Sequence, residues 1–419
     1  MLPQIMTGRP LYPLVLTILM IAGCGNGSDE NDHQADAPPV PSAPASSEPK
    51  PVSVAELRKQ LGANDDGVFQ KIGGKIREVD LAGTGVSDLT PLQGLPLEIL
   101  YAPELAISDL SPLAGMPLDT LVLTGTDVTD LTPLAGVPLV RLSIAETNVS
   151  DLSPLAGAPL EQLDARQTGT VDISPLANTK LRELILMETG VADLSALTGL
   201  PLKLLDVSKT DVSDLSPLAG MQLVSLYLEE TDVADVGPLA DMPLEKLWLK
   251  GTQVADISPL AGKRFSELSL TDTPVSTIEA CATMPAIGIL WVRGTQVSDL
   301  SPLTSVPITS LDVQETPVSD LGPLAGKLTL ERLNIADSEV TDLRPLEGLQ
   351  LRRLIFTPSN IELGLDIVRR MSSIETLDIE FEDPESALRP DAFWRKYDAG
   401  EFDADQATPD ETGSASPAR

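Results

Sequence analysis

The sequence predicts a solenoid, a coil of short repeats in which each repeat contributes one strand and one tight return. A 21-residue segment at residues 118–138, LDTLVLTGTDVTDLTPLAGVP, returns at once as LVRLSIAETNVSDLSPLAGAP at residues 139–159. One residue after each expected strand, usually threonine, marks thirteen copies of this unit: Thr84, Leu105, Thr126, Thr147, Thr168, Thr189, Thr210, Thr231, Thr252, Thr273, Thr295, Thr316 and Ser338. A single unit is unstable, because its roughly six aliphatic side chains contribute about 2–3 kcal/mol each, whereas ordering each backbone residue costs about 1–2 kcal/mol. Stacked neighbours must therefore share one continuous core.

Within each repeat, the apolar spacing at residues 118–123 predicts a strand, and a short helical turn follows it. Pro133 has no N–H group and suits the first position of this turn, with Thr132 as its N-cap. Gly136 then allows a backbone conformation that other residues resist. Each repeat thus returns the chain to the start of the next strand.

The repeat L-x-x-L-x-L-x-x-T-x-V-x-D-L-S-P-L-x-G-x-P resembles the leucine-rich repeat, in the short bacterial form found in internalins. The resemblance covers about residues 76–380. It implies an α/β-type repeat solenoid, a horseshoe with a parallel β-sheet on the concave face and short turns or 3-10 segments on the convex face. The chain departs from the family where threonine replaces the usual asparagine after the strand. Because a hydroxyl can still bond to nearby backbone, we expect the same coil with a changed internal ladder.

The first 23 residues have the features of a lipoprotein signal peptide. Arg9 precedes a mostly apolar run at residues 11–21, which is too short to span a bilayer as a helix. The sequence Ile-Ala-Gly-Cys that ends at Cys24 resembles the bacterial lipobox, which implies cleavage before Cys24 and lipidation of its sulfur. The alternative is an ordinary signal peptide that happens to contain a cysteine. Residues 24–52 are acidic and proline-rich, which predicts a disordered tether.

The remaining segments predict a capped repeat domain. We expect an N-terminal cap at residues 53–75 with a helix at residues 54–61, leucine-rich repeats at 76–358 and a C-terminal cap at 359–402. In the C-terminal cap we expect a helix at 361–371, a last strand at 374–379, and docked aromatic side chains, namely Phe393, Trp394, Tyr397 and Phe402. Residues 403–419 are expected to be disordered.

The composition argues against several functions. A net charge of −33 disfavours direct binding to nucleic acid or to an anionic membrane surface. The only histidine, His33, lies in the tether, so histidine-based catalysis and metal ligation are not expected in the repeats. Cys281 takes the core position that Leu260 has one repeat earlier, and we expect it to be buried. The sequence therefore predicts a protein that is not an enzyme, with no catalytic residues, no cofactor and no metal.

A file of aspartates is the most regular polar feature of the repeats. It consists of Asp88, Asp109, Asp130, Asp151, Asp172, Asp193, Asp214, Asp235, Asp256, Asp299, Asp320 and Asp342. One interpretation is a calcium ladder, but one carboxylate per repeat offers few ligands for each ion. The favoured interpretation is that each carboxylate accepts backbone N–H bonds at the start of its turn.

The concave face is where we expect function. In L-x-x-L-x-L-x-x-T, the third, fifth, seventh and eighth residues point away from the core. The fifth place holds Tyr227, Trp248 and Trp291, which predicts an exposed aromatic column flanked by three cations, Lys246, Lys250 and Arg293. Aromatic residues and arginine grouped in this way are typical of protein-binding hot spots. The alternative is that the rings only pack across neighbouring strands.

Together these features predict a lipid-anchored protein of a bacterial cell envelope, held on the exported side by the lipid on Cys24. In a Gram-negative cell, the resemblance to lipoproteins implies the outer membrane or cell surface, because Gly25 stands where the usual retention signal is aspartate. We expect a monomer that binds an unidentified protein partner through its concave face. A second hypothesis is carbohydrate binding, with sugar rings on Trp248 and Trp291 and their hydroxyls bound by Asp206 and Glu229. A third is a structural spacer in the envelope.

Overall fold

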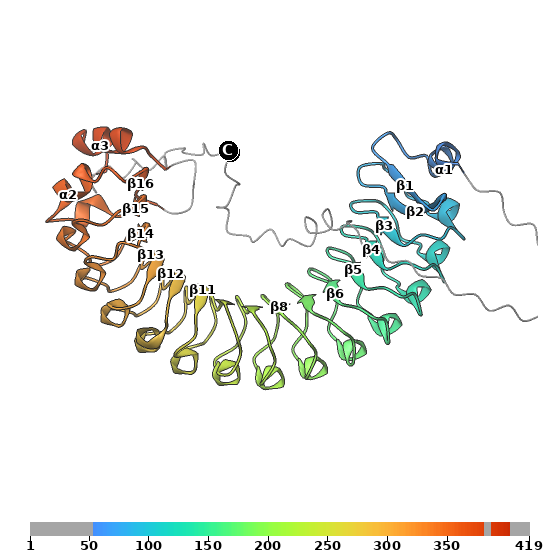
Figure 1. The fold of residues 1–419 in the computed structure, drawn as a ribbon, viewed down its shortest axis with the longest axis horizontal. Helices are drawn as coiled ribbons and strands as arrows, with labels where there is room; N and C mark the ends of the chain where they lie inside the picture. Colours follow the sequence, from blue (N-terminus) through green and yellow to red (C-terminus); the bar gives the residue numbers. More distant parts are fainter. Residues whose placement is uncertain (1–52, 381–386, 403–419) are drawn as a thin grey trace, which may run out of the picture. The chain divides into compact units, whose positions relative to one another are not determined.

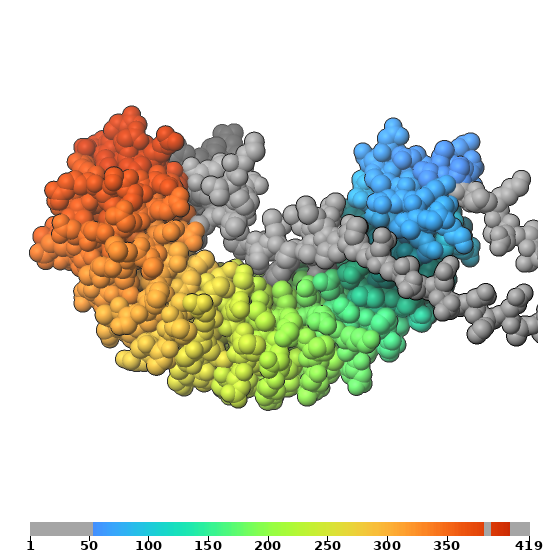
Figure 2. All heavy atoms as spheres, in the orientation of Figure 1, coloured from blue at the N-terminus to red at the C-terminus, as the bar shows by residue number. Residues whose placement is uncertain are grey.

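The computed structural model describes residues 53–380 and 387–402, which form one sixteen-stranded sheet. The strands follow the order of the chain, and from β2 to β16 every neighbouring pair is parallel and in register, as between Leu100, Leu121 and Leu142. Figure 1 shows the strands along the inner, concave side of the curved repeats and the one-turn helices along the outer side. In Figure 2 the same repeats form a band in which each contacts the next. The predicted repeat solenoid is confirmed.

The strands are β1 (Val68–Ile72), β2 (Lys75–Asp80), β3 (Ile99–Tyr101), β4 (Thr120–Val122), β5 (Arg141–Ser143), β6 (Gln162–Asp164), β7 (Glu183–Ile185), β8 (Leu204–Asp206), β9 (Ser225–Tyr227), β10 (Lys246–Trp248), β11 (Phe265–Ser269), β12 (Ile287–Trp291), β13 (Ile308–Asp312), β14 (Arg332–Asn334), β15 (Arg353–Ile355) and β16 (Thr376–Asp378). The α-helices are α1 (Val54–Leu61), α2 (Leu365–Arg370) and α3 (Pro390–Asp398). The 3-10 turns are η3 (Thr90–Leu92), η4 (Ser111–Leu113), η5 (Thr132–Leu134), η6 (Ser153–Leu155), η7 (Ser174–Leu176), η8 (Ser195–Leu197), η9 (Ser216–Leu218), η10 (Gly237–Leu239), η11 (Ser258–Leu260), η12 (Glu279–Thr283), η13 (Ser301–Leu303), η14 (Gly322–Leu324), η15 (Arg344–Leu346) and η16 (Pro358–Asn360).

The threonine that follows the strand in eleven of the repeats is buried and holds its own repeat together. Its hydroxyl donates to the carbonyl oxygen three residues earlier, as from Thr126 to Leu123 at 2.7 Å and from Thr231 to Leu228 at 2.7 Å. Ser338 does the same toward Ile335. The expectation that a hydroxyl here bonds to nearby backbone is therefore confirmed, and the bond stays within one repeat.

The start of each 3-10 turn differs in detail from the prediction. Thr132 is the first residue of η5 rather than its N-cap, and Pro133 is the second. The N-cap position belongs to Leu131, whose side chain cannot accept a hydrogen bond. The carboxylate of Asp130 accepts the Thr132 N–H at 2.7 Å and does the capping instead. Gly136 has φ +76°, which agrees with the prediction that it needs unusual backbone freedom.

The N-terminal end contains the predicted helix and an unpredicted hairpin. Helix α1 buries Leu57 and Leu61 and is capped by the side chain of Ser53. Strand β1 pairs antiparallel with β2 through a two-residue Gly73–Gly74 turn, in which both residues have positive φ. The Gly-Gly pair between two strand-like segments was the sequence signal for this hairpin.

At the C-terminal end, the predicted helix is shorter than expected. Gly364, with φ +87°, precedes α2, so the helix begins at Leu365 and not at residue 361. Strand β16 lies within the predicted last strand. On α3, Phe393 is fully buried, with ring centroids 5.5 Å from Phe356 and 4.9 Å from Phe402. Trp394 and Tyr397 contact each other at 5.6 Å, so the predicted aromatic side chains do meet.

The predicted signal peptide, Cys24, the tether and the tail at 403–419 lie outside the described residues. Among the helices that are described, none combines the length and apolar character needed to cross a bilayer.

Candidate functional site

Three aromatic rings form a row on the inner sheet. Tyr227 on β9 is the register partner of Trp248 on β10, and their ring centroids lie 5.5 Å apart at an interplanar angle of 72°. Trp248 also contacts Trp291 at 5.8 Å and 64°. Both contacts are edge to face, a favoured arrangement for aromatic pairs. We call these three residues the aromatic row.

The contact between the tryptophans depends on a small residue in the strand between them. Trp291 lies on β12, and Ser269 on β11 is the register partner of both tryptophans. Because serine occupies little space above the sheet, the two large rings meet over it. The sequence places the tryptophans two strands apart, but not in contact.

The row is less exposed than predicted at one end. Tyr227 is only 6% exposed, whereas Trp248 and Trp291 are half-buried. Burial raises the pKa of Tyr227 to about 12, and nearby Glu267 adds to the shift. The expectation of a fully exposed column is therefore wrong for Tyr227, which is covered because Trp248 packs against it. The two tryptophans supply the accessible aromatic surface.

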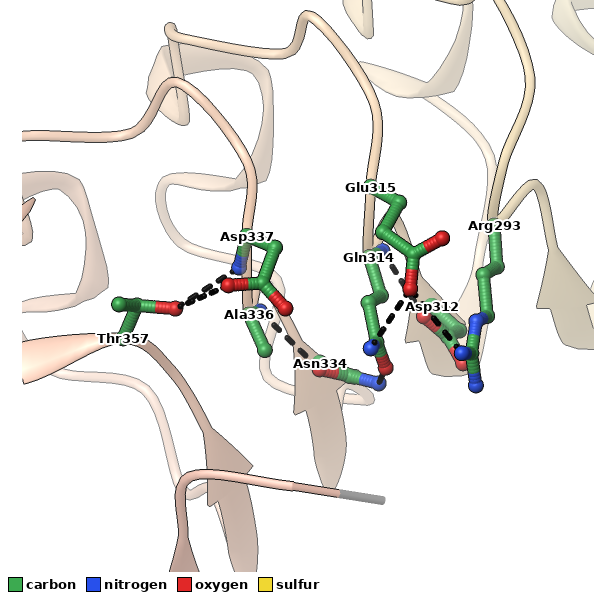
Figure 3. Close-up of polar contacts among 8 residues, drawn as sticks. All are labelled: Arg293, Asp312, Gln314, Glu315, Asn334, Ala336, Asp337 and Thr357. Atoms are coloured by element: carbon green, nitrogen blue, oxygen red, sulfur yellow. Dashed lines mark hydrogen bonds and ion pairs between the residues drawn. The ribbon is translucent and has the colours of Figure 1, made fainter. Parts of the chain in front are cut away.

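Two of the three flanking cations are already paired within the protein. Lys246 donates to Glu267 at 2.6 Å, and the indole N–H of Trp248 donates to the other oxygen of Glu267 at 3.1 Å. Arg293 donates to Glu315 at 3.0 Å, as Figure 3 shows. Lys250 is exposed. The structure thus places the predicted residues on or just after β9, β10 and β12, and it pairs Lys246 and Arg293 with the protein's own carboxylates.

Beside the aromatic row, Glu229 has a pKa well above the ordinary value of a glutamate. Burial raises its pKa to about 7, the negative charge of Asp206 adds to the rise, and Lys250 opposes it. The side chain is half-buried at the seventh place, directly after Tyr227 and Leu228. A carboxyl group that titrates near neutral pH therefore lies beside the aromatic row.

Asp206 cannot play the role that the carbohydrate hypothesis gave it. Its side chain is fully buried, and its carboxylate accepts the Ser208 N–H at 2.9 Å. Asp164 and Asp312, at the same place in other repeats, accept the N–H two residues on, at 3.2 and 2.9 Å. Burial raises the pKa of each of these two to about 6. These aspartates bind the backbone where the strand ends and are not available to sugar hydroxyls.

A polar network continues from Arg293 toward the C-terminal repeats (Figure 3). Asn334 donates to the side-chain oxygen of Gln314 at 2.9 Å and accepts the Ala336 N–H at 3.1 Å. Gln314 in turn donates to Glu315 at 3.2 Å, the carboxylate that holds Arg293. These bonds fix the chain where it leaves the strands next to the aromatic row.

The residue at the eighth place of each repeat has a left-handed backbone. Nine of these residues are not glycine: Glu104, Glu146, Gln167, Glu188, Lys209, Glu230, Asp272, Glu315 and Asp337. Glycine takes this place in the repeats of both tryptophans, as Gly251 and Gly294. A Cβ on Gly251 would lie 3.4 Å from Cγ of Glu230, and one on Gly294 would lie 2.2 Å from Oδ1 of Asp272. The acidic side chains therefore lean over these glycines, into the repeats of the tryptophans.

The aspartate file caps the 3-10 turns. Each carboxylate accepts the N–H two residues on, at 2.7–2.9 Å from Asp88 to Asp342. Hydrogen bonds from the side chain and the backbone N–H of the residue two positions on hold the pKa values of these carboxyl groups below their usual range, at Asp88, Asp130, Asp172, Asp214, Asp256, Asp299 and Asp342. In the repeat without an aspartate, the hydroxyl of Thr277 accepts the Glu279 N–H at 3.3 Å. The capping interpretation is confirmed. Within the described ranges, no three His, Cys, Asp or Glu side chains are grouped to hold a metal ion.

Cys281 is fully buried in η12, as predicted. Burial raises the pKa of its thiol to about 12, so it is neutral at physiological pH and unreactive as a nucleophile.

The aromatic row lies on the concave sheet face, apart from two grooves of the described residues. One groove of about 570 Å³ is lined by Met242, Phe265 and Gly288 among others, and one of about 230 Å³ is lined by residues near α2. No residue of the aromatic row lines either groove. An open face of this kind suits a macromolecule better than a small ligand.

No family model matches the chain, and no curated protein matches it significantly. Among solved structures, a leucine-rich-repeat protein of Leptospira interrogans has a TM-score of 0.54 at 15% identity, over 79% of this chain and all of that one. The functional domain of InlJ from Listeria monocytogenes has a TM-score of 0.52 at 18% identity, over 71% of each chain. The ectodomain of the receptor kinase GASSHO1 from Arabidopsis thaliana has a TM-score of 0.53 at 15% identity, over 79% of this chain and 42% of that one. The chain therefore has the leucine-rich-repeat solenoid fold, with an internalin among the solved structures that it resembles.

Proposed function

We propose that this protein is a non-catalytic recognition module that binds another protein through its concave face. The aromatic row carries the proposal. Trp248 and Trp291 form a half-buried, edge-to-face pair in the middle of the concave sheet face, and Tyr227 on the neighbouring strand packs edge to face against Trp248. Rigid aromatic side chains that keep part of their surface accessible are typical of the residues that dominate protein interfaces.

The polar surroundings favour a protein partner over a carbohydrate. Sugar binding through an aromatic platform needs nearby groups that can bind hydroxyls. Asp206 is buried and bound to the backbone, and Glu267 already receives both the Trp248 indole N–H and the Lys246 ammonium. A protein segment can use the aromatic surface and the rim charges without displacing these bonds.

The proposal includes the sequence-based anchor. The lipobox-like sequence before Cys24 supports attachment to a membrane of the bacterial envelope through a lipid, and residues 24–52 would tether the repeats to it. Full acylation would supply several chains, and more than one is needed for stable anchoring. Palmitate labelling of the intact chain and of its Cys24→Ala variant tests this part separately. Label on the variant would contradict it.

The test of binding is affinity capture from envelope extract. The chain from residue 24 onward, with Cys24→Ser, is compared with the same chain carrying Tyr227→Ala, Trp248→Ala and Trp291→Ala. Because Tyr227 is buried, a second variant with only Trp291→Ala guards against a folding defect. A control variant carries Val171→Ala and Leu328→Ala, two apolar residues that are 63% and 69% exposed outside the row. All forms are checked by circular dichroism.

A protein captured by the native chain and the control, and lost with both aromatic variants, supports the proposal. Equal capture by all forms would move the site away from the aromatic row. No capture by any form would overturn the proposal and leave the spacer hypothesis.

A further inference from the structure

Around the aromatic row, the groups that remain outside the internal ion pairs are mostly carboxylates. Lys246 is paired with Glu267, and Arg293 with Glu315. Glu230 and Asp272, at the eighth places of the flanking repeats, are exposed. Of the three predicted cations, Lys250 is the exposed one. Its charge interacts with the half-buried carboxyl group of Glu229. Around the row, carboxylates therefore exceed the cations available to an incoming partner.

Glu230 and Asp272 lie next to the eighth-place glycines of the two tryptophan repeats. Gly251 belongs to the repeat of Trp248, and the side chain of Glu230 from the preceding repeat lies within 3.4 Å of the position that a Cβ would take there. Gly294 belongs to the repeat of Trp291, and Asp272 lies over it in the same way, at 2.2 Å. Each tryptophan repeat thus has an acidic residue of the preceding repeat beside its eighth place. Acidic residues and glycines alternate at this place in four successive repeats: Glu230, Gly251, Asp272 and Gly294.

We propose that the partner presents a cationic segment, with arginine or lysine side chains over Trp248 and Trp291 and Glu230 and Asp272 as their counter-charges. This inference rests on the proposed function and specifies the chemistry of the partner. A cation within about 6 Å of an indole centroid is attracted by the ring, and a nearby carboxylate adds a charge-assisted bond. The net charge of −33 on the whole chain draws a cationic segment toward the face and repels an acidic one.

The probe is a short synthetic peptide of alternating arginine and glycine. Its neutral control has citrulline in place of arginine, and its acidic control has glutamate. Binding to the chain from residue 24 onward, with Cys24→Ser, is followed by tryptophan fluorescence at two salt concentrations. The test variant is Glu230→Gln with Asp272→Asn. The matched control is Asp127→Asn with Asp211→Asn, which removes the same charge from two exposed aspartates in other repeats.

We expect the arginine peptide to bind with a change in tryptophan fluorescence, and the citrulline and glutamate peptides not to bind. Glu230→Gln with Asp272→Asn should weaken binding about tenfold, and the matched control less than about twofold, because only contacts near the rings are specific. Equal weakening by the two variants would mean diffuse attraction to an acidic protein and would overturn the proposal. Binding of the citrulline or glutamate peptide as tight as that of the arginine peptide would also overturn it.

The same two variants, used in the envelope capture experiment, separate this inference from the proposed function. Loss of the captured protein with Glu230→Gln and Asp272→Asn, but not with the matched control, supports a cationic partner. Capture that needs Trp291 but is unchanged by Glu230→Gln and Asp272→Asn would overturn the cationic segment and leave protein recognition intact. No capture by the native chain would overturn the proposed function itself.

Discussion

Trp248 and Trp291 meet edge to face at 5.8 Å although a whole strand separates them. Their contact requires that Ser269, which lies between them and is 6% exposed, stays small. The aromatic surface of the concave face is therefore set by a residue that is not itself aromatic.

Enlarging Ser269 should separate the two rings. Ser269→Leu places a branched side chain where the tryptophans meet, and we expect it to lower the free energy of unfolding by about 1–3 kcal/mol through overpacking. The near-ultraviolet circular dichroism of the indole pair should weaken as well. Ser269→Ala, which keeps the space open, is the control. A Leu variant with an unchanged near-ultraviolet spectrum would show that the rings do not need this gap.

The buried threonine ladder makes a second prediction. Thr231→Val keeps the shape of the side chain but removes the hydroxyl that donates to the Leu228 carbonyl at 2.7 Å. The free energy of unfolding should fall by about 1–2 kcal/mol, because a buried carbonyl loses its partner. Thr231→Ser should cost less, since Ser338 makes the same bond in its own repeat. Chemical denaturation of the three forms measures the difference, and equal stability of Val and Thr would contradict the assignment.

Repeat-to-repeat variation at the aspartate file gives a third prediction. Thr277 accepts the Glu279 N–H at 3.3 Å, longer than the 2.7–2.9 Å of the aspartates at this place. Thr277→Asp should restore the stronger cap and raise the free energy of unfolding by up to about 1 kcal/mol, whereas Thr277→Ala should lower it. Thermal unfolding of the two variants beside the native chain measures both effects. A lower midpoint for Asp than for Ala would mean that the charge of nearby Glu279 outweighs the cap.

The carboxyl groups predict that the protein is most stable in mildly acidic solution. In the folded protein the pKa values of Glu229, Asp164 and Asp312 are raised to about 7, 6 and 6. Their contribution to the free energy of unfolding is therefore fully present below their pKa values in the unfolded chain, near 4. It is lost as pH rises through 6 to 7, because the carboxyl groups then become charged in buried places. The exposed capping aspartates have lowered pKa values and act in the opposite direction, since their contribution is lost as pH falls below about 4. The unfolding midpoint should therefore be highest between about pH 4 and 6.

Glu229→Gln isolates one contribution to this profile. At pH 8 the native glutamate is charged in a half-buried place, so the variant should be more stable by about 1 kcal/mol or more. At pH 4.5 both folded proteins carry a neutral side chain at position 229, and the difference in their free energies of unfolding should shrink. If the free energies of unfolding of the two proteins differ by the same amount at both pH values, Glu229 does not titrate in this range.

The repeat pattern was enough to predict the fold because all the recurring residue types indicate the same strand and turn. Leucine spacing, the buried threonine and the capping aspartate recur in phase, so one repeat predicts the next. The pattern could also place Tyr227, Trp248 and Trp291 on one face. It could not give their exposure, because burial of Tyr227 depends on how the Trp248 ring tilts against it.

Other features depend on contacts that a repeat pattern does not encode. The pairing of Lys246 with Glu267 and of Arg293 with Glu315 joins residues about one repeat apart, and it occupies two of the three predicted cations. The β1–β2 hairpin lies outside the repeat and follows from a Gly73–Gly74 turn. These are the points where the individual side chain matters more than its place in the repeat.

The most direct test of the central claim is site-specific photo-crosslinking in the producing cells. A benzoylphenylalanine residue replaces Lys250, which is exposed beside Trp248 on the inner face, or Gln253, an exposed residue that follows the buried Thr252 beyond the strand. Recognition through the aromatic row predicts a discrete protein adduct from position 250, absent from position 253 and lost when Trp291→Ala is added. An adduct from position 253 alone, or an adduct from position 250 that survives Trp291→Ala, would contradict recognition through this row.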